Sequence, residues 1–502
     1  MSTRIYTGPS GAAAPGQIAL DALENLIMTR GALLAVQDGP GVTGFGGSHA
    51  LAIAGDIAVS GEGISLTGDG NRVTITASGS ITSGESAIAI NGAGTRVINH
   101  GDITSLGDFA ITFGAVVSTN APPGIGKVSL YNAGVINGGI SNSVNDLNIR
   151  NLGQIICAST DIDSIAVLGG DHREVVTNLG TIQGDMNLGN GANTVSNRGV
   201  IDGDIRTGGD QDVVDNRLGT ISGGVFLGDG ADTYMPSSGV DSYVDGGFGT
   251  FDTLDFSKGD AVRFALNNSI AATGAAAGDV YLGFERVLGS DLGDDLLIGN
   301  DGDNYLEGGG GNDELRGGDG KDSLKGGNGN DILNGGAGND ILLGDESQLA
   351  INSNDTLIGG DGTDAIKGGA GDDIINGGAG ADDLSGDFGV SFSAFGKDVF
   401  VFDNASIKGS SLADNTDRIR DFFGADKIDL SGIDANGYTK PGDQAFIYIN
   451  GDPFHNVIGE LRTAIINKIA VLQGDLNGDG IADFAIKIDS QSSVISVDSI
   501  VL

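Results

Sequence analysis

Carboxylates recur at nine-residue intervals in the middle of this 502-residue sequence. From Gly308 the unit occurs four times without a gap, as GGGGNDELR, GGDGKDSLK, GGNGNDILN and GGAGNDILL; from Gly359 it occurs three more times, as GGDGTDAIK, GGAGDDIIN and GGAGADDLS. Glycines at positions one, two and four allow positive φ angles, so the chain can turn tightly with its carbonyl groups pointing inward. Asp at position six adds a carboxylate to this ring of oxygens. Oxygen ligands of this kind are typical of calcium sites.

Position eight of the unit is apolar, which predicts a short strand that faces a thin core. These residues are Leu315, Leu324, Leu333, Leu342, Ile366, Ile375 and Leu384. Weaker copies accompany the two blocks, as SDLGDDLLI and GNDGDNYLE from Ser290 and as AINSNDTLI before Gly359. The alternative interpretation, a disordered Gly/Asp linker, does not explain the regular apolar position.

The repeat segment is strongly acidic. Between Ser290 and Val390 it contains 22 acidic residues against four basic ones, a difference of -18. Without a metal these charges repel one another, and few apolar side chains are present to offset an ordering entropy of roughly 1 to 2 kcal/mol per residue. The sequence therefore predicts that this segment is disordered at the low calcium of a cytosol and folds in the higher calcium outside a cell.

The unit resembles the calcium-binding nonapeptide repeat of RTX proteins. In that family two nonapeptides form one coil of a parallel β-roll, and calcium lies between the turns. The resemblance implies several Ca2+ ions, with these ligands: Asp295, Asp313, Asp322, Asp331, Asp340, Asp355, Asp364, Asp373 and Asp382. Asn304 replaces Asp in the second weak unit, so that unit lacks its carboxylate.

The C-terminal hundred residues have a different texture, with strands such as DVFVFDN and SVISVDSIVL. Their order resembles the C-terminal domain that follows RTX repeats in serralysin-type proteases and related proteins exported by type I machinery. In those proteins a C-terminal Asp followed by apolar residues is an uncleaved export signal, and Asp498 to Leu502 fits this pattern. The resemblance implies a protein secreted by a Gram-negative bacterium, extracellular or at the cell surface. It would explain why Met1 to Gly16 lack the apolar stretch of a cleaved signal.

A second group of oxygen-bearing residues lies in DLNGDGIAD near the C-terminus: Asp475, Asn477, Asp479 and Asp483. Gly480 takes the sharp-turn position of a calcium loop, but position twelve is Ile486 instead of the bidentate Glu, which argues against an EF-hand. Two interpretations stay open, a second kind of calcium site and a plain turn between strands.

A looser repeat, Asn-x-Gly, runs through the first half of the chain. The asparagines are Asn99, Asn132, Asn151, Asn178, Asn197 and Asn216, with Asn spacings of 33, 19, 27, 19 and 19. A coil of about 19 residues with insertions fits a parallel β-helix, with two or three short strands per coil and the asparagines stacked as a structural ladder. The segment from Gln17 to Arg30 is a capping helix or the first coil.

These observations predict an all-β chain: a right-handed parallel β-helix, a calcium-binding parallel β-roll and a β-rich C-terminal cap domain. The predicted segments are an N-terminal cap (1–40), the β-helix (41–236), a connecting segment (237–289), the roll (290–386) and a serralysin-like C-terminal domain with the export signal (387–502). In the connecting segment, Asp252 and Asp255 are further candidate calcium ligands.

Composition narrows the function. A formal net charge of -41 with only 26 Lys and Arg argues against nucleic-acid and anionic-membrane partners. The sequence also contains no run of about 18 apolar residues, the length that could span a bilayer. Cys157 is alone and cannot form an intramolecular disulfide. A zinc protease is excluded because the sequence lacks H-E-x-x-H.

Two functional classes remain, and the first is a non-catalytic surface, matrix or adhesion protein, with an extracellular polysaccharide or a cell surface as possible partner. The absence of a convergent titratable cluster favours it. The rival is a polysaccharide-active enzyme, epimerase-like or lyase-like, with the β-helix as catalytic domain. Its candidate residues are Arg198, Arg217, Asp210, Asp212 and Asp215, for which a solvated charged face is the alternative.

Overall fold

The computed structural model describes residues 2–8, 17–22, 24–114, 126–143, 145–157, 164–241, 243–249, 251–274, 276–345, 353–387, 396–404, 406–407, 416–435, 445–490 and 495–502. The prediction of an all-β chain is confirmed, since the regular structure in these ranges is β-strand apart from the 3-10 turn η1 (Val497–Ser499). None of the described residues belongs to a helix long and apolar enough to cross a membrane. The chain forms two compact units, Met1–Leu254 with Gly278–Phe284 and Asp255–Ala277 with Glu285–Leu502. The five segment boundaries given above stay predictions.

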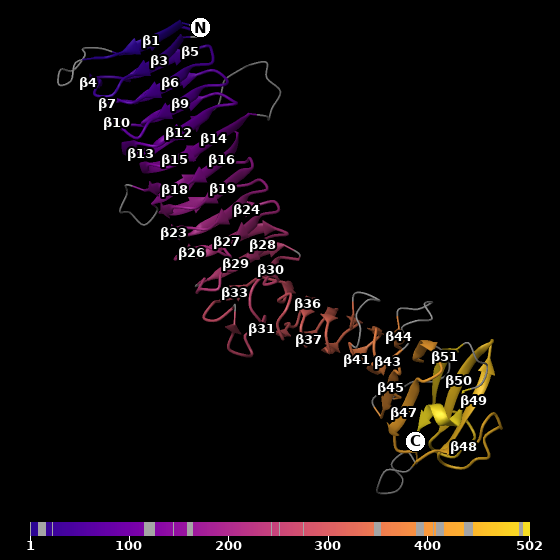
Figure 1. Ribbon diagram of the computed structural model, residues 1–502. Coiled ribbons are helices and arrows are strands. Elements are labelled where there is room, and N and C mark those ends of the chain that lie inside the picture. Colours follow the sequence, from indigo (N-terminus) through magenta and orange to yellow (C-terminus); the bar gives the residue numbers. More distant parts are fainter. Residues whose placement is uncertain are drawn as a thin grey trace. The chain divides into compact units, whose positions relative to one another are not determined.

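The first unit is a parallel β-solenoid, in which each strand pairs with its equivalent one coil later (Figure 1). One face contains β1 (Ser2–Tyr6), β3 (Glu24–Met28), β6 (Ala50–Ile53), β9 (Arg72–Ile75), β12 (Arg96–Asn99), β14 (Lys127–Asn132), β16 (Asp146–Asn151), β19 (Glu174–Asn178), β22 (Thr194–Asn197), β25 (Val213–Asp215), β28 (Thr233–Met235) and β30 (Thr253–Asp255). The other strands form a second sheet: β2 (Ile18–Leu20), β4 (Leu33–Val36), β5 (Val42–Phe45), β7 (Asp56–Val59), β8 (Ile64–Thr67), β10 (Ser80–Ser83), β11 (Ile88–Asn91), β13 (Asp102–Gly114), β15 (Val135–Asn142), β17 (Gln154–Ile156), β18 (Ile165–Leu168), β20 (Thr181–Gln183), β21 (Asp185–Asn187), β23 (Val200–Asp202), β24 (Ile205–Gly209), β26 (Thr220–Ile221), β27 (Val225–Gly230), β29 (Val244–Gly249) and β33 (Tyr281–Leu282).

One coil of this unit contributes three strands, as in β22, β23 and β24, which pair in parallel with β25, β26 and β27. Inward-facing residues of successive coils therefore stack in columns. Along the first sheet one column contains Val73, Val97, Leu130, Ile149, Val176, Val195, Val214 and Tyr234, each at most 1% exposed. Full burial of such a side chain stabilises the fold by roughly 1.5 to 3 kcal/mol.

The predicted asparagine ladder is confirmed. The Nδ2 of each ladder asparagine donates to the Oδ1 of the next, over 2.8 to 2.9 Å. The ladder residues, Asn99, Asn132, Asn151, Asn178, Asn197 and Asn216, are at most 1% exposed. Buried amides that satisfy one another fix the register of the coils.

The segment from Gln17 to Arg30 forms strands, not the capping helix that was one of its two predicted alternatives. β2 pairs with β5 through Ile18 and Val42, and β3 pairs with β6 through Leu26 and Leu51. A buried, alternating pattern such as that of β3 suits a strand with one face on the core.

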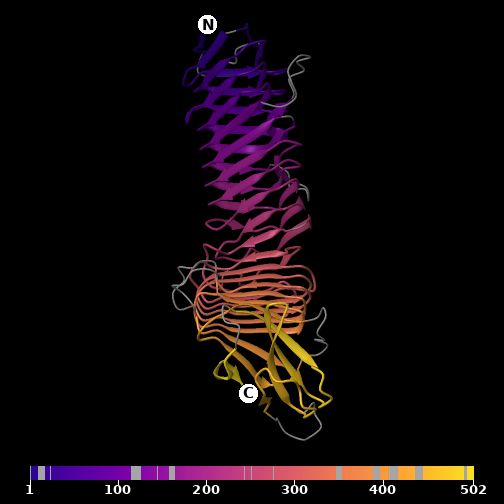
Figure 2. The ribbon, with the colours of Figure 1, turned by 90° about the vertical axis from the view of Figure 1, so that its right-hand side faces the viewer.

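The second unit contains a roll in which two strands form one 18-residue coil (Figure 2). One sheet contains β31 (Val262–Ala265), β32 (Thr273–Gly274), β35 (Leu296–Ile298), β37 (Glu314–Asp319), β39 (Ile332–Ala337), β41 (Thr356–Gly362), β43 (Ile374–Gly380), β45 (Val399–Asp403), β47 (Lys427–Gly432) and β52 (Ile500–Val501). Facing strands are β34 (Arg286–Leu288), β36 (Tyr305–Gly310), β38 (Ser323–Asn328), β40 (Ile341–Leu343), β42 (Ala365–Gly369), β44 (Asp383–Asp387) and β46 (Arg418–Phe422).

The apolar position eight of each repeat lies inside the roll, as the sequence predicts. Leu297, Leu315, Leu333, Leu357, Ile375, Phe400 and Ile428 form one column, and Leu306, Leu324, Leu342, Ile366, Leu384 and Ile419 form the other. None of these side chains is more than 2% exposed. The core is only two residues thick, so the turns on either side must supply much of the stability.

Beyond the roll the sheet becomes mixed. β51 (Phe484–Ser490) continues in parallel from β46, and β50 (Ile469–Asp475) and β49 (Glu460–Ile466) follow as antiparallel strands, with β48 (Ile447–Tyr448) beside β49. This end of the second unit is the β-rich cap that the sequence predicts.

Candidate metal centre

The position-six residues of the repeats form two rows, each built from alternate units. In the first row the backbone N–H of Asp295 donates to Oδ1 of Asp313, and that of Asp313 donates to Oδ1 of Asp331, both over 2.7 Å. The row continues through Asp355 and Asp373 with N···O distances of 2.8 Å. In the second row the backbone N–H of each residue likewise donates to Oδ1 of the next, with N···O distances of 2.8 Å. Its members are Asn304, Asp322, Asp340, Asp364 and Asp382.

The second carboxylate oxygen, Oδ2, has no hydrogen-bond partner in eight of the nine predicted ligands. These are Asp313, Asp322, Asp331, Asp340, Asp355, Asp364, Asp373 and Asp382. Their side chains are buried, with at most 2% of the residue exposed. A buried carboxylate oxygen without a donor is strongly destabilising unless a proton or a cation compensates it.

Asp295 is the exception among the predicted ligands. Its Oδ1 accepts the N–H of Val262 over 2.6 Å, and its Oδ2 accepts the N–H of Ser290 over 2.6 Å. Both oxygens are therefore satisfied within the protein, so Asp295 differs from the other eight.

The first glycine of the repeat makes room for Oδ2. A Cβ on Gly317 would collide with Oδ2 of Asp322 and lie 2.5 Å from the carbonyl oxygen of Gly335. The same collision with the position-six carboxylate recurs at Gly308, Gly326, Gly335, Gly344, Gly359, Gly368 and Gly377. Side-chain and backbone oxygens therefore converge beside each first glycine, in a space that any other residue would fill.

The glycines do not all serve the same purpose. The second and fourth glycines, such as Gly327 and Gly329, have φ angles of 112° and 131°, in the left-handed region. The first glycines do not lie in this region. The expectation of positive φ at position one is therefore wrong, because this glycine is required for close approach and not for backbone conformation.

Comparison with known families agrees with this geometry. Residues 290–324, 316–347 and 351–390 match the RTX calcium-binding nonapeptide repeat. The chain carries RTX repeats. A search of curated proteins found no match.

Calcium in the RTX repeats would need backbone ligands. Among the described residues, no three His, Cys, Asp or Glu side chains form a group that could hold a metal ion. Eight unpartnered carboxylate oxygens beside stacked carbonyls still fit a hard cation, since calcium accepts carboxylate and carbonyl oxygens together. Each ion would therefore take few carboxylates and several backbone oxygens.

Burial raises the pKa of the RTX carboxyls, opposed by the N–H that each accepts. The pKa is raised to about 6 for Asp331 and Asp382, about 7 for Asp322 and Asp364, about 8 for Asp313 and Asp355 and about 9 for Asp373. Neighbouring carboxylates raise most of these values further, as Asp398 does for Asp373. A bound cation would reverse this effect because it stabilises the ionised form.

Both rows continue past the RTX repeats into residues that sequence reasoning missed. The N–H of Asp373 donates to Asp398 over 3.0 Å, and that of Asp382 donates to Asp417 over 2.9 Å. Asp398 also has an unpartnered Oδ2. Burial raises the pKa of Asp398 and of Asp417 to about 8. The signal for both was an Asp two residues before a buried apolar residue, as in Asp398-Val-Phe400, without the glycines.

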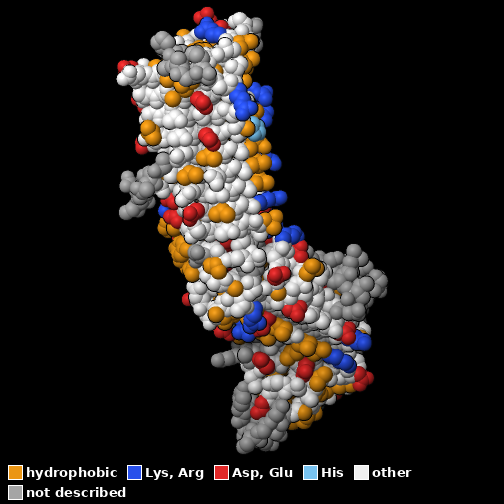
Figure 3. All heavy atoms as spheres, turned by 60° about the vertical axis from the view of Figure 1, so that its left-hand side comes forward, with side chains coloured by type: hydrophobic (Ala, Val, Ile, Leu, Met, Phe, Trp, Pro, Cys, Tyr) orange, Lys and Arg blue, Asp and Glu red, His pale blue; other side chains and the backbone are white. Residues whose placement is uncertain are grey.

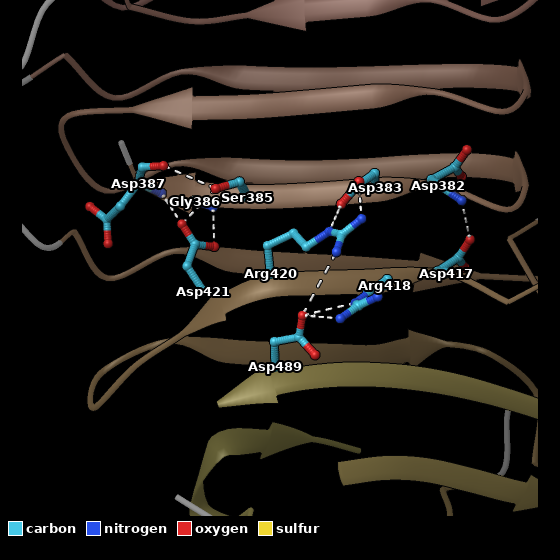
Figure 4. A network of polar contacts seen from close by, with 10 residues as sticks. All are labelled: Asp382, Asp383, Ser385, Gly386, Asp387, Asp417, Arg418, Arg420, Asp421 and Asp489. Atoms are coloured by element: carbon cyan, nitrogen blue, oxygen red, sulfur yellow. Dashed lines mark hydrogen bonds and ion pairs between the residues drawn. The ribbon is translucent and has the colours of Figure 1, made fainter. Parts of the chain in front are cut away.

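Figure 4 shows how the second row ends. Asp421 accepts hydrogen bonds from the Ser385 hydroxyl over 2.6 Å and from the N–H groups of Gly386 and Asp387 over 2.9 Å. Arg420 pairs with Asp383, and Arg418 donates to Asp489 over 2.8 Å. These contacts attach the last RTX coil to the cap.

The residues of DLNGDGIAD form the turn between β50 and β51. Asp475 accepts N–H groups of Gly478 over 2.6 Å and Gly480 over 2.8 Å, and Asp483 accepts that of Leu476 over 2.6 Å. Asp479 accepts the N–H of Ile481 over 2.8 Å, and the side chain of Asn477 donates to Asp483 over 2.9 Å. The carboxylates thus close the turn on themselves, which favours the plain turn over the second calcium site.

Three candidate residues of the enzyme alternative, Asp215, Arg217 and Arg198, lie near one another, and the other two differ in exposure. Asp212 is fully buried and accepts a backbone N–H, whereas Asp210 is exposed. Asp215 forms an ion pair with Arg217 at 2.9 Å, and this pair lowers the pKa of Asp215.

In the connecting segment, the two candidate calcium ligands accept backbone hydrogen bonds. Asp252 accepts the N–H of Asp232, and Asp255 accepts the N–H of Ser257, both over 2.8 Å.

Proposed function

We propose that this is a secreted calcium-binding protein with a non-catalytic structural or adhesive role outside the cell. Its roll folds when calcium binds the RTX repeats. The β-solenoid of the first unit then presents its outer surface to an extracellular polysaccharide or a cell surface. On the face drawn in Figure 3, acidic side chains lie singly or in small groups, with apolar side chains and some Lys and Arg among them.

The observation that carries this proposal is the repeated buried carboxylate oxygen without a partner. Eight such oxygens in the turns of one thin roll are incompatible with an ionised, metal-free roll. The proposed ligands are these eight Oδ2 atoms and nearby carbonyl oxygens, such as that of Gly335 beside Asp322. Asp295 and the turn from Asp475 to Asp483 are weaker ligands in this proposal because their oxygens already accept hydrogen bonds.

Export by type I machinery is part of the same proposal. The terminal residues pair in the folded protein, with Ile500 opposite Ile428 and Val501 opposite Asp429. A roll that stays unfolded at cytosolic calcium would keep this terminus accessible to an exporter and fold only after leaving the cell. RTX repeats are typical of secreted bacterial proteins, which supports this localisation.

A calcium titration of the full chain tests the folding step. Far-UV circular dichroism should show β-structure increasing as millimolar calcium is added to chelator-treated protein. A spectrum that is already complete in chelator at alkaline pH would refute the proposal.

The non-catalytic role needs its own test. We expect purified, calcium-loaded protein to leave alginate, pectate and other acidic glycans chemically unchanged, measured by unsaturated-product absorbance and C5 inversion. The same glycans and whole cells, immobilised, should retain the protein in a pull-down. Turnover of any glycan would overturn the non-catalytic role but not the calcium-binding role.

A further inference from the structure

Two coils of the first unit, outside the residues that match the RTX repeat, contain turns built like those of the roll. The turns are Thr207–Asp212 (TGGDQD) and Leu227–Asp232 (LGDGAD). Their second residues, Gly208 and Gly228, have φ angles of 100° and 104°. A Cβ on Gly228 would collide with the carbonyl oxygen of Gly208, as one on Gly327 in the roll would collide with that of Gly309. The backbone turns therefore stack in the same way.

The carboxylates of these turns repeat the hydrogen bonding of the roll. The N–H of Asn193 donates to Oδ1 of Asp212, and that of Asp212 donates to Oδ1 of Asp232, both over 2.7 Å. Asp212 and Asp232 are 0% exposed. Oδ2 of each has no hydrogen-bond partner. Like the carboxylates of the roll, these two therefore have a buried Oδ2 that a cation could compensate.

Asn193 lies one coil before Asp212 at the equivalent position, and its contacts show which groups surround that position. Its Oδ1 accepts a backbone N–H as the aspartates do, and its Nδ2 donates to the carbonyl oxygens of Gly189 over 3.1 Å and Thr207 over 2.9 Å. The second side-chain atom at this place in the ladder therefore faces backbone oxygens. An amide can donate its hydrogens to these backbone carbonyl oxygens, whereas an ionised carboxylate has no hydrogen to donate.

Two earlier coils follow the same rule, whereas another has the carboxylate of Glu174 at this position, with an Oε2 that has no hydrogen-bond partner. In the first two, the side chain that closes the turn donates a hydrogen to the carbonyl of the turn glycine. The pairs are Asn71 with Gly68 and Thr95 with Gly92. Donor side chains thus close these turns, and acceptor-only side chains replace them at Asp212 and Asp232.

No hydrogen bond of the described residues brings a hydrogen to Oδ2 of Asp212 or Asp232. Burial raises the pKa of Asp212 and the nearby Thr207 side chain opposes this rise, but the Thr207 hydroxyl donates to the carbonyl oxygen of Leu227 over 2.7 Å. Asp210 and Asp229, in the same turns, are exposed carboxylates that add negative charge. A cation is the group that can lie between a carboxylate oxygen and carbonyl oxygens and attract both.

We propose that the turns ending at Asp212 and Asp232 bind calcium in a row of their own within the first unit. The ligands are Oδ2 of the two aspartates and backbone carbonyl oxygens of the stacked turns. This row is separate from the RTX repeats, and the proposal stands whether or not the protein adheres to a surface.

A proton on Oδ2 is the competing explanation, since a protonated carboxyl can also donate to a carbonyl. Burial raises the pKa of Asp212 to about 7. The test is therefore made at about pH 8.5, where a carboxyl with this pKa is ionised.

Hydrogen exchange by mass spectrometry on the full chain tests the proposal, with millimolar calcium or with chelator. In the wild type, peptides covering 205–235 should exchange about tenfold more slowly with calcium. The variant D212N/D232N should lose this calcium effect and be protected already in chelator, because Asn supplies the amide hydrogen as Asn193 does. The matched control D210N/D229N removes two exposed charges from the same turns and should keep the calcium effect.

Peptides from 305–345 serve as an internal reference, since their calcium response depends on the RTX repeats alone. The inference is overturned if calcium leaves 205–235 unchanged in the wild type, or if D212N/D232N responds to calcium as the wild type does. Failure of the roll peptides to respond, with a response at 205–235, would refute the role of the RTX repeats and leave this site standing.

Discussion

Without calcium, the roll should be ordered in mild acid and unfold as the pH rises. A carboxyl whose pKa is raised by folding holds more protons in the folded state than in the unfolded chain. The free energy of unfolding therefore falls as pH rises from the ordinary pKa to the raised one. Most acidic proteins lose stability in acid through paired carboxylates, so the expected direction here is the opposite.

The magnitude follows from the raised values. Each pH unit between the two pKa values costs about 1.4 kcal/mol per carboxyl. Asp313, raised from 3.8 to about 8, therefore loses about 3 kcal/mol between about pH 5.5 and pH 8. The carboxyls with a pKa of about 8 or 9 are Asp313, Asp355, Asp373, Asp398 and Asp417. All five lose stability in the same direction, and the loss at Asp313 alone is a large fraction of the whole stability of a domain, roughly 5 to 15 kcal/mol.

Hydrogen exchange of peptides from 305–345 and 355–387 measures this directly, because it reports on the roll separately from the first unit. In chelator these peptides should be protected at about pH 5.5 and unprotected at about pH 8.5. Saturating calcium should protect them at both pH values. Equal protection at both pH values in chelator would refute the reasoning.

Three further substitutions test the contributions of the roll core, the repeat turns and the asparagine ladder. Leu333→Ala should destabilise the calcium-loaded roll by roughly 2 to 5 kcal/mol in denaturant titrations, whereas the neighbouring Ile332→Ala, at a side chain 48% exposed, should have little effect. Gly317→Ala should weaken calcium binding in calorimetry because its Cβ collides with a ligand oxygen; unchanged affinity would argue against the site geometry. Asn151→Ala, which breaks bonds to both neighbouring asparagines, should cost roughly 3 kcal/mol with or without calcium, and a calcium-dependent loss would contradict a purely structural ladder.

Periodic features were predictable from the sequence because each coil places the same residue types in the same surroundings. Leu333 and its equivalents face the core because a strand alternates its side chains, and two nine-residue units complete a coil and return the same residue to the same column. Asn151 and its equivalents stack because they end equivalent strands of successive coils, and a buried amide can both donate and accept.

Other features were not predictable because insertions and non-local contacts decide them. Asp398 and Asp417 follow the preceding members of their rows by 25 and 35 residues, so no fixed spacing reveals them. The hydrogen bonds that satisfy Asp295 come partly from Val262, 33 residues earlier. The role of the first glycine depends on the oxygen that lies opposite it in the folded roll, which no local pattern specifies.

Calcium uptake by a row-specific variant tests the central claim most directly. Replacing Asp313, Asp331, Asp355 and Asp373 with Asn keeps each Oδ1 acceptor and removes the unpartnered oxygens of one row; replacing the exposed Asp294, Asp303, Asp319 and Asp361 removes the same charge elsewhere. In equilibrium dialysis at alkaline pH, the first variant should bind several fewer calcium ions per chain than the wild type, and the second should bind as many. Equal uptake by the wild type and the first variant would contradict the account.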